Sequence, residues 1–273
     1  MKKLCVLLVL VMALSGAAMA ETPATPTVDC DGFTYVVLEN GTAQIVDWQG
    51  ADAALEVPAT LDGLPVTSIS ECAFADNDVL TSIALPSTVT EIGEEAFSGC
   101  VSLGQVNLPE GLLRIGDLAF YGCESLTQIE LPDSVVAVGV NPFKACDNLY
   151  DVFVSPEHPY LATIDGVLFS KPDKRLVCYP MGLSAEHYAV PEGILTIGAS
   201  AFDRDLYIES IHLPGTLVCI EREAFYGCEG LKVMNLPASV TTIGEEAMVC
   251  SNLVLTIEGE GVQLAMADGS GEA

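Results

Sequence analysis

Hydrophobic and polar positions repeat along most of this chain with a period of 23 residues, and two columns share that period. One column holds an aliphatic residue followed by proline, and the other holds phenylalanine, usually preceded by alanine. The first contains Val57-Pro58, Leu85-Pro86, Leu108-Pro109, Leu131-Pro132, Val190-Pro191, Leu213-Pro214 and Leu236-Pro237, with Val154-Ser155 in phase. The second contains Phe74, Phe97, Phe120, Phe143, Phe202, Phe225 and finally Met248. Such self-similarity predicts a solenoid in which each repeat forms one turn.

The residues within one repeat predict its local structure. Val106 and Leu108 alternate with polar residues, as in a short strand with one buried face, and Pro109 ends the strand because it has no N–H to donate. A glycine such as Gly116 is expected to permit the bend that follows. Stacked repeats bring these strands about 4.8 Å apart into a parallel ribbon. Prolines at this spacing exclude long amphipathic helices, so we expect helix only as a turn or so around each Ala-Phe pair.

These columns resemble the BspA-type leucine-rich repeat family, over about residues 30 to 257. The combination of I-x-L-P, V-x-x-I-G and A-F at constant spacing is specific to that family. The resemblance implies a right-handed, β-rich solenoid that acts as an adhesion or recognition module and has no catalytic residues. The chain departs from the pattern at Ser70 and Glu221, which replace the turn glycine, at Pro142, which replaces alanine, and at Met248, which replaces phenylalanine.

The same pattern divides the chain into segments. Residues 1–20 have the charged start, apolar run and small-residue cleavage site of a secretory signal peptide, so we expect an exported protein that begins at Glu21. No later stretch is long and apolar enough to span a membrane. Residues 21–29 are predicted to be a linker, 30–57 an N-terminal capping hairpin turning at Asn40-Gly41, and 58–257 the solenoid. Residues 258–273 are predicted to form a flexible tail.

The solenoid contains one insertion. The interval from Val154 to Val190 is 36 residues, one repeat plus 13, and its sequence predicts a hairpin inserted at about residues 156–186. This segment carries cationic and aromatic residues in an acidic chain, and insertions in solenoids often bind ligands. Two interpretations remain open, a binding element and a structural spacer. The binding candidates are Tyr160, Lys171, Lys174 and Tyr179.

A second set of binding candidates lies on the predicted ribbon. Residues that alternate with the buried ones must face solvent. Their small, amide and charged side chains suit hydrogen bonds to a protein or glycan, although any soluble sheet would display similar residues. These candidates are Gln105, Asn107, Gln128, Glu130, Asp151, Phe153, Ser210, His212 and Asn235.

Charge narrows the class of partner. The chain has 38 acidic and 10 basic residues, for a formal net charge of −28. Such a field repels nucleic acid and anionic lipid and favours cations and basic partners. Acidic residues also recur beside the turn, where stacking would align them into an edge with weak affinity for calcium. They are Glu71, Glu94, Glu95, Asp117, Glu221, Glu245 and Glu246.

The cysteines do not form a motif for metal binding or catalysis. Nine remain after the signal, no C-x-x-C pair occurs, and we expect no cofactor or metal centre. Cys100, Cys123, Cys146 and Cys228 share one position of the repeat, where equivalent side chains point the same way, so buried free thiols are favoured over disulfides. A hydrolase built on Cys178 and His187 would lack an orienting group.

The sequence therefore predicts a non-catalytic protein that is extracellular or associated with the cell surface. Two functions remain open: recognition or adhesion through the ribbon or the insertion, and a structural role in assembling the cell envelope. A repeating scaffold specifies a surface but leaves its ligand undetermined.

Overall fold

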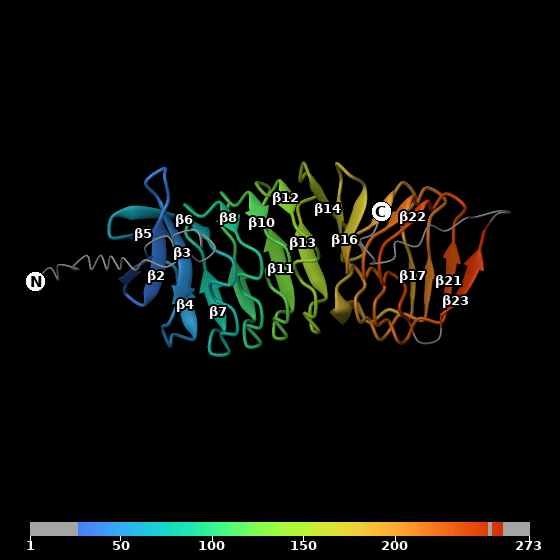
Figure 1. Ribbon diagram of the computed structural model, residues 1–273, viewed down its shortest axis with the longest axis horizontal. Coiled ribbons are helices and arrows are strands. Elements are labelled where there is room, and N and C mark those ends of the chain that lie inside the picture. The colour runs from blue at the N-terminus through green and yellow to red at the C-terminus, as the bar shows by residue number, and fades with distance from the viewer. Residues whose placement is uncertain (1–26, 251–252, 259–273) are drawn as a thin grey trace, which may run out of the picture.

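The computed structural model describes residues 27–250 and 253–258, and it is a solenoid of stacked turns that runs from the N-terminal to the C-terminal end of the long axis (Figure 1). The predicted signal peptide, residues 21–26 of the predicted linker and residues 259–273 of the predicted tail lie outside the described residues. Successive turns are about 23 residues apart, as the sequence predicts.

The first wall of the solenoid is a ribbon of parallel strands in three sheets. Their registers join residues one repeat apart, such as Ile83 with Val106 and Ile211 with Met234. The sheets are β4 (Ala54–Glu56), β7 (Ser82–Ala84) and β9 (Gln105–Asn107); β11 (Gln128–Leu131) and β13 (Asp151–Val154); and β17 (His187–Ala189), β19 (Ser210–His212), β21 (Val233–Leu236) and β23 (Val254–Ile257).

The second wall consists of shorter parallel strands, which we call the back row. One sheet of it contains β6 (Leu64–Ile69), β8 (Glu91–Ile92), β10 (Arg114–Ile115) and β12 (Ala137–Val138). The other contains β16 (Arg175–Cys178), β18 (Thr196–Ile197), β20 (Cys219–Ile220) and β22 (Thr242–Ile243). The helical element of the described residues is the short 3₁₀ helix η1 (Met181–Leu183), and hydrogen-bonded turns surround the Ala-Phe pairs.

Stacked aromatic rings fill the space between the walls. Phe74, Phe97, Phe120 and Phe143 follow one another with ring centroids 5.1, 5.2 and 5.7 Å apart. Such contacts add about 0.5–1.5 kcal/mol per pair to the free energy gained by burying the rings. The aromatic column is therefore a principal stabilising feature of the stack.

Most repeats have a glycine after the back-row strand, such as Gly116. The structure gives a reason for this glycine that differs from the bend predicted from the sequence. A Cβ on Gly116 would lie 2.5 Å from the backbone nitrogen of Glu94 in the preceding turn, and one on Gly244 would lie 2.4 Å from that of Arg222. Glycine is needed because neighbouring turns approach closely here, whereas neither residue has a positive φ.

An antiparallel sheet covers the N-terminal end of the stack. It contains β2 (Phe33–Val37) and β3 (Ala43–Trp48), the two strands of the predicted hairpin, and β3 pairs with β6 of the back row. The indole of Trp48 lies 6.1 Å from the ring of Phe74, so it covers the end of the aromatic column.

Segment boundaries differ from the prediction at this end. Residues 27–29, expected in a linker, belong to β1 (Thr27–Cys30), which pairs with β2. Residues 54–56, expected in the cap, form the first ribbon strand. A small hairpin between β5 (Thr60–Leu61) and β6 lengthens the first turn.

The insertion is a three-stranded meander. β14 (Leu161–Ile164) and β15 (Val167–Ser170) pair antiparallel, and β15 pairs in the same way with β16, which then continues the back row by pairing in parallel with β18. Both the ribbon and the back row are interrupted here, and the solenoid has an N-terminal and a C-terminal half.

Candidate recognition surface

The exposed side of the ribbon is set by strand alternation. In β11, Ile129 and Leu131 are buried while Gln128 and Glu130 are exposed, and β13 repeats the pattern with exposed Asp151 and Phe153. The parallel register places Gln128 beside Asp151 and Glu130 beside Phe153. Exposed side chains from separate repeats therefore form one continuous surface.

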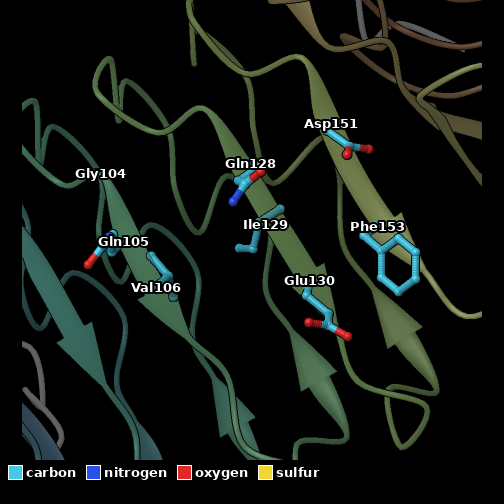
Figure 2. Close-up of a pocket in the computed structure, with 8 residues that line it drawn as sticks. All are labelled: Gly104, Gln105, Val106, Gln128, Ile129, Glu130, Asp151 and Phe153. Carbon is cyan, nitrogen blue, oxygen red and sulfur yellow. The ribbon is translucent and has the colours of Figure 1, made fainter.

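This surface has a shallow hollow of about 420 Å³ in the N-terminal half (Figure 2). Gln105, Gln128, Glu130, Asp151 and Phe153 line it, so it unites five of the predicted binding residues. Phe153 is 49% exposed at the last ribbon strand before the insertion. Asn107 lies in an adjoining hollow between β4, β7 and β9.

The C-terminal half of the ribbon has a second hollow, of about 500 Å³. It unites the predicted residues Ser210, His212 and Asn235 with His187, whose Nδ1 lies 2.8 Å from Ser210 Oγ. His187 was absent from the predicted ribbon residues, although it lies 23 residues before Ser210.

In the hollow of the C-terminal half, the side chain of Asn235 stabilises the backbone of the preceding turn. Its side-chain oxygen accepts the N–H of Leu213 at 2.7 Å, and its Nδ2 donates to the carbonyl of the same residue at 2.9 Å. Nδ2 also donates to Glu258 at 3.0 Å. Ser210 and His212 are therefore the predicted residues that remain more open to a ligand in this half.

The insertion residues do not form one site. Lys171 and Lys174 lie in the exposed turn between β15 and β16, and the Lys171 ammonium donates to the carbonyl of His158. Tyr160 is partly exposed before β14. His158 is buried: its Nδ1 accepts the N–H groups of Tyr160 and Leu161, at 3.1 and 3.0 Å.

Tyr179 is a correction to the predicted binding surface. It is 3% exposed, and its ring stacks on Phe202 in the interior. It lies 23 residues before Phe202, so it occupies the phenylalanine position of its turn. That spacing was available in the sequence but was obscured by the insertion.

The nine cysteines that the structure describes are free, and five of them are buried. The thiols of Cys100, Cys123 and Cys146 donate to the carbonyls of Phe74, Phe97 and Phe120, and Cys228 donates to that of Phe202, at 2.9–3.3 Å. Burial raises the pKa of Cys100 to about 11. The shared position thus holds packed, hydrogen-bonded thiols.

The cysteine hydrolase considered above finds no support in the geometry. Cys178 is buried, and burial raises the pKa of its thiol well above the ordinary value, which disfavours the reactive thiolate. His187 instead lies on the exposed ribbon beside Ser210.

Some carboxylates of the acidic edge already form hydrogen bonds or ion pairs within the protein. Asp117 accepts the N–H of Val140 at 2.9 Å, and Glu221 pairs with Arg175 at 3.0 Å. Within residues 27–250 and 253–258, three or more His, Cys, Asp or Glu side chains do not gather as they would around a metal ion.

A polar cluster that the sequence did not reveal joins the two halves. Lys144 Nζ lies 3.5 Å from Asp203 Oδ2 and 3.4 Å from Glu223 Oε2. Nearby, Asn141 Nδ2 donates to the carbonyl of Ser200 at 2.6 Å. Burial raises the pKa of Asp203, and the Lys144 ammonium opposes that shift.

In the part of the chain that the structure describes, no helix has the length and apolar character needed to cross a bilayer.

Comparison with known proteins settles the family. A profile described as "BspA type leucine rich repeat region" matches residues 67–175 and 178–260, with six copies of the repeat. The chain belongs to this family. The resemblance stated from the sequence is thereby confirmed, and the solenoid fold agrees with it.

Solved structures share the BspA-type fold. A leucine-rich repeat protein from Eubacterium ventriosum is 20% identical with a TM-score of 0.60, over 83% of this chain and 71% of that one. The pneumococcal vaccine antigen PcpA is 20% identical with a TM-score of 0.54, over 86% of this chain and 82% of that one. At this identity the likeness concerns the fold alone. No curated protein sequence gives a significant match.

Proposed function

We propose that this chain is a non-catalytic recognition or adhesion module that works outside the cell and binds a protein or glycan through the ribbon. The signal-like N-terminus supports export. This proposal depends mainly on the hollow of the ribbon, which the half-exposed ring of Phe153 shares with the carboxylates of Glu130 and Asp151 and the amide of Gln128. An aromatic anchor surrounded by polar groups is typical of a binding centre.

A matched pair of variants tests this function. Phe153→Glu places a charge in the hollow, whereas Val136→Glu places the same charge at a similarly exposed position just before β12 of the back row. Each protein is immobilised and exposed to glycans and to extracellular protein extracts. We expect saturable binding by the wild type and Val136→Glu and its loss in Phe153→Glu. Equal binding by all three would contradict a ribbon site.

The role of the insertion is a separate part of the proposal. Tyr160, Lys171 and Lys174 are exposed and would give the ligand a second contact outside the hollow, whereas Tyr179 is excluded because it is buried. Lys171→Ala and Lys174→Ala together should weaken binding of an acidic ligand and leave folding unchanged. No change in affinity would leave the insertion as a structural spacer.

The alternative is a structural role in assembling the cell envelope. It is favoured by the exposed Val254 and Ile257 on β23, which pairs with β21 alone among the described strands. An open strand edge with apolar side chains is suited to association with another copy. Concentration-dependent self-association in sedimentation experiments, without ligand binding, would support this role.

We also propose that the acidic edge binds calcium weakly. Its physical basis is the repulsion between stacked carboxylates such as Glu94 and Asp117, which a divalent cation relieves. Calorimetry with millimolar calcium should give a small heat. No heat would remove calcium from the proposal.

A further inference from the structure

A groove of about 910 Å³ lies away from the ribbon, on the edge of the solenoid that follows the aromatic column. It crosses the junction between the halves. Tyr121, Ala145 and Asp147 belong to turns on the N-terminal side, and Arg204, Leu206 and Tyr226 belong to turns on the C-terminal side. Met181 of η1 lies between them in the chain and also lines the groove.

The local backbone explains why this edge is hollow. In regular turns the second residue after phenylalanine has a positive φ and bonds to the next turn, as from Gly99 N–H to the Tyr121 carbonyl at 2.7 Å. The same pattern runs from Gly227 N–H to the Val249 carbonyl at 2.9 Å. At Met181, η1 replaces that turn and packs toward Leu149, to which Gly182 donates at 2.8 Å. Glycines on both sides add no side chains to fill the space.

The groove exposes apolar side chains from several turns, including Val101 and Val249. Leu206 is the most exposed of them at 56%, and it lies one residue after the cysteine column, where other turns have Glu124, Asp147, Glu229 or Val101. Met181 and the rings of Tyr121 and Tyr226 line the same groove. An exposed leucine among aromatic and sulfur-containing side chains is a typical anchor for an apolar side chain of a partner.

The charge around this apolar centre is mostly negative. Glu124, Asp147 and Glu229 are exposed along the groove. Arg204 is the cation among the lining residues, and its Nε already lies 3.9 Å from Asp203 Oδ2. The field of the whole chain has the same sign, with a formal net charge of −28. Charge complementarity therefore favours a cationic occupant.

We propose that this groove binds an extended cationic segment of a partner protein. Lysine or arginine side chains of the segment pair with Glu124, Asp147 and Glu229, and an apolar side chain packs against Leu206. The tyrosine faces add contacts with cations. This surface is separate from the ribbon hollow of Phe153.

The test uses the full chain and a fluorescent twelve-residue peptide of alternating lysine and leucine as the probe. Leu206→Glu is the informative variant because glutamate occupies the equivalent position at Glu124 and Glu229, so the fold accommodates it. The variant adds a negative charge and would strengthen binding that is only electrostatic. We expect it to weaken binding about tenfold or more, as loss of an interface anchor does. Val136→Glu adds the same charge on the back row, away from the groove, and should leave binding unchanged.

The peptide-binding results distinguish a cationic ligand in the groove from the alternatives. Weaker binding by Leu206→Glu, with unchanged binding by Val136→Glu, supports the proposal. Equal or tighter binding by Leu206→Glu overturns it, as does an equal loss in Val136→Glu. Equal affinity for a glutamate–leucine peptide overturns the choice of a cationic occupant. Self-association of the wild type that Leu206→Glu abolishes would assign the groove to a second copy instead.

Discussion

The ring of Tyr179 stacks on that of Phe202, with centroids 5.0 Å apart and planes inclined by 23°. Tyr179 begins the aromatic column of the C-terminal half, which continues through Phe202 to Phe225, so its ring is part of the core of that half. We expect Tyr179→Ala to lower the free energy of unfolding by about 3–5 kcal/mol, as for other large-to-small core changes. Tyr179→Phe, the residue found elsewhere in the column, should cost about 1 kcal/mol. Urea unfolding followed by circular dichroism measures both. Similar small effects for the two variants would contradict a core position.

Asp205 makes stability depend on pH. It occupies the cysteine position of its turn, and its Oδ1 accepts the N–H groups of Tyr207 and Ile208 at 2.9 and 2.8 Å. Burial raises the pKa of Asp205, and the hydrogen bonds from Ile208 and Tyr207 oppose that shift. Its Oδ2 has no hydrogen-bond partner in the described structure. The folded state then holds the proton more tightly, so stability falls as pH rises from the ordinary pKa through the raised one.

Asp205→Asn should remove the loss of stability that Asp205 causes as the pH rises. Asn77 occupies the equivalent position and accepts the N–H groups of Val79 and Leu80 in the same way, so asparagine fits. At pH 7 we expect the variant to be more stable than the wild type by about 1–3 kcal/mol, the cost of an unsatisfied buried group. Below the ordinary carboxyl pKa of about 3.9 the difference should vanish. Paired urea titrations at pH 7 and pH 3.5 measure it, and an equal difference at both values would refute the assignment.

We expect Lys144 to contribute more to the free energy of unfolding than an exposed lysine does. Its ammonium lies between Asp203 and Glu223 at the junction of the halves, and the Asp203 side chain is 2% exposed. Lys144→Met leaves these carboxylates facing each other, at a cost of about 3 kcal/mol. Lys232 pairs with Glu209 at an exposed position, so Lys232→Met should cost at most about 1 kcal/mol. Equal unfolding free energies for the two variants would mean that the junction does not need the buried ion pair.

The thiols should differ in reactivity according to burial. Cys72 is exposed, whereas Cys100, Cys123, Cys146, Cys178 and Cys228 are buried. In the native protein at pH 8, we expect a thiol reagent to modify Cys72 first, because it is exposed, and the five buried residues only after unfolding. Desolvation and the nearby carboxylates of Glu95 and Glu71 raise the pKa of Cys72, so it should react more slowly than a free thiol. Mass spectrometry of labelled peptides gives the order. In the denatured protein lacking Cys5, fewer than seven reactive thiols would indicate disulfides.

The repeat made most of the fold predictable. The two columns determine which side chains share the interior, and Asn40-Gly41 marks the turn that joins β2 to β3. The four residues of β1 are too few to show a clear period. The pairing of Lys144 with Asp203 could not be predicted, because it depends on how the insertion changes the stacking of turns that are 59 residues apart.

The candidate surface was predictable to the extent that strand alternation determines it. Gln128, Glu130, Asp151 and Phe153 are exposed because they alternate with core residues, and their register then brings them together. Tyr179 was placed on the surface because it lies close to the insertion in sequence, but the aromatic column places it inside. The groove of Leu206 depends on the conformation of η1, which has no distinct sequence signal.

Photo-crosslinking at position 153 tests whether the ribbon contacts the ligand. A benzoylphenylalanine replaces Phe153 in one protein and Val136, on the back row, in another, and each is illuminated in extracellular extract or with immobilised glycans. If the ribbon recognises the ligand, a saturable crosslinked product forms at position 153, unlabelled wild-type protein competes it away, and little or none forms at position 136. Equal crosslinking at both positions, or none at 153 despite binding of the wild type, would contradict recognition through the ribbon.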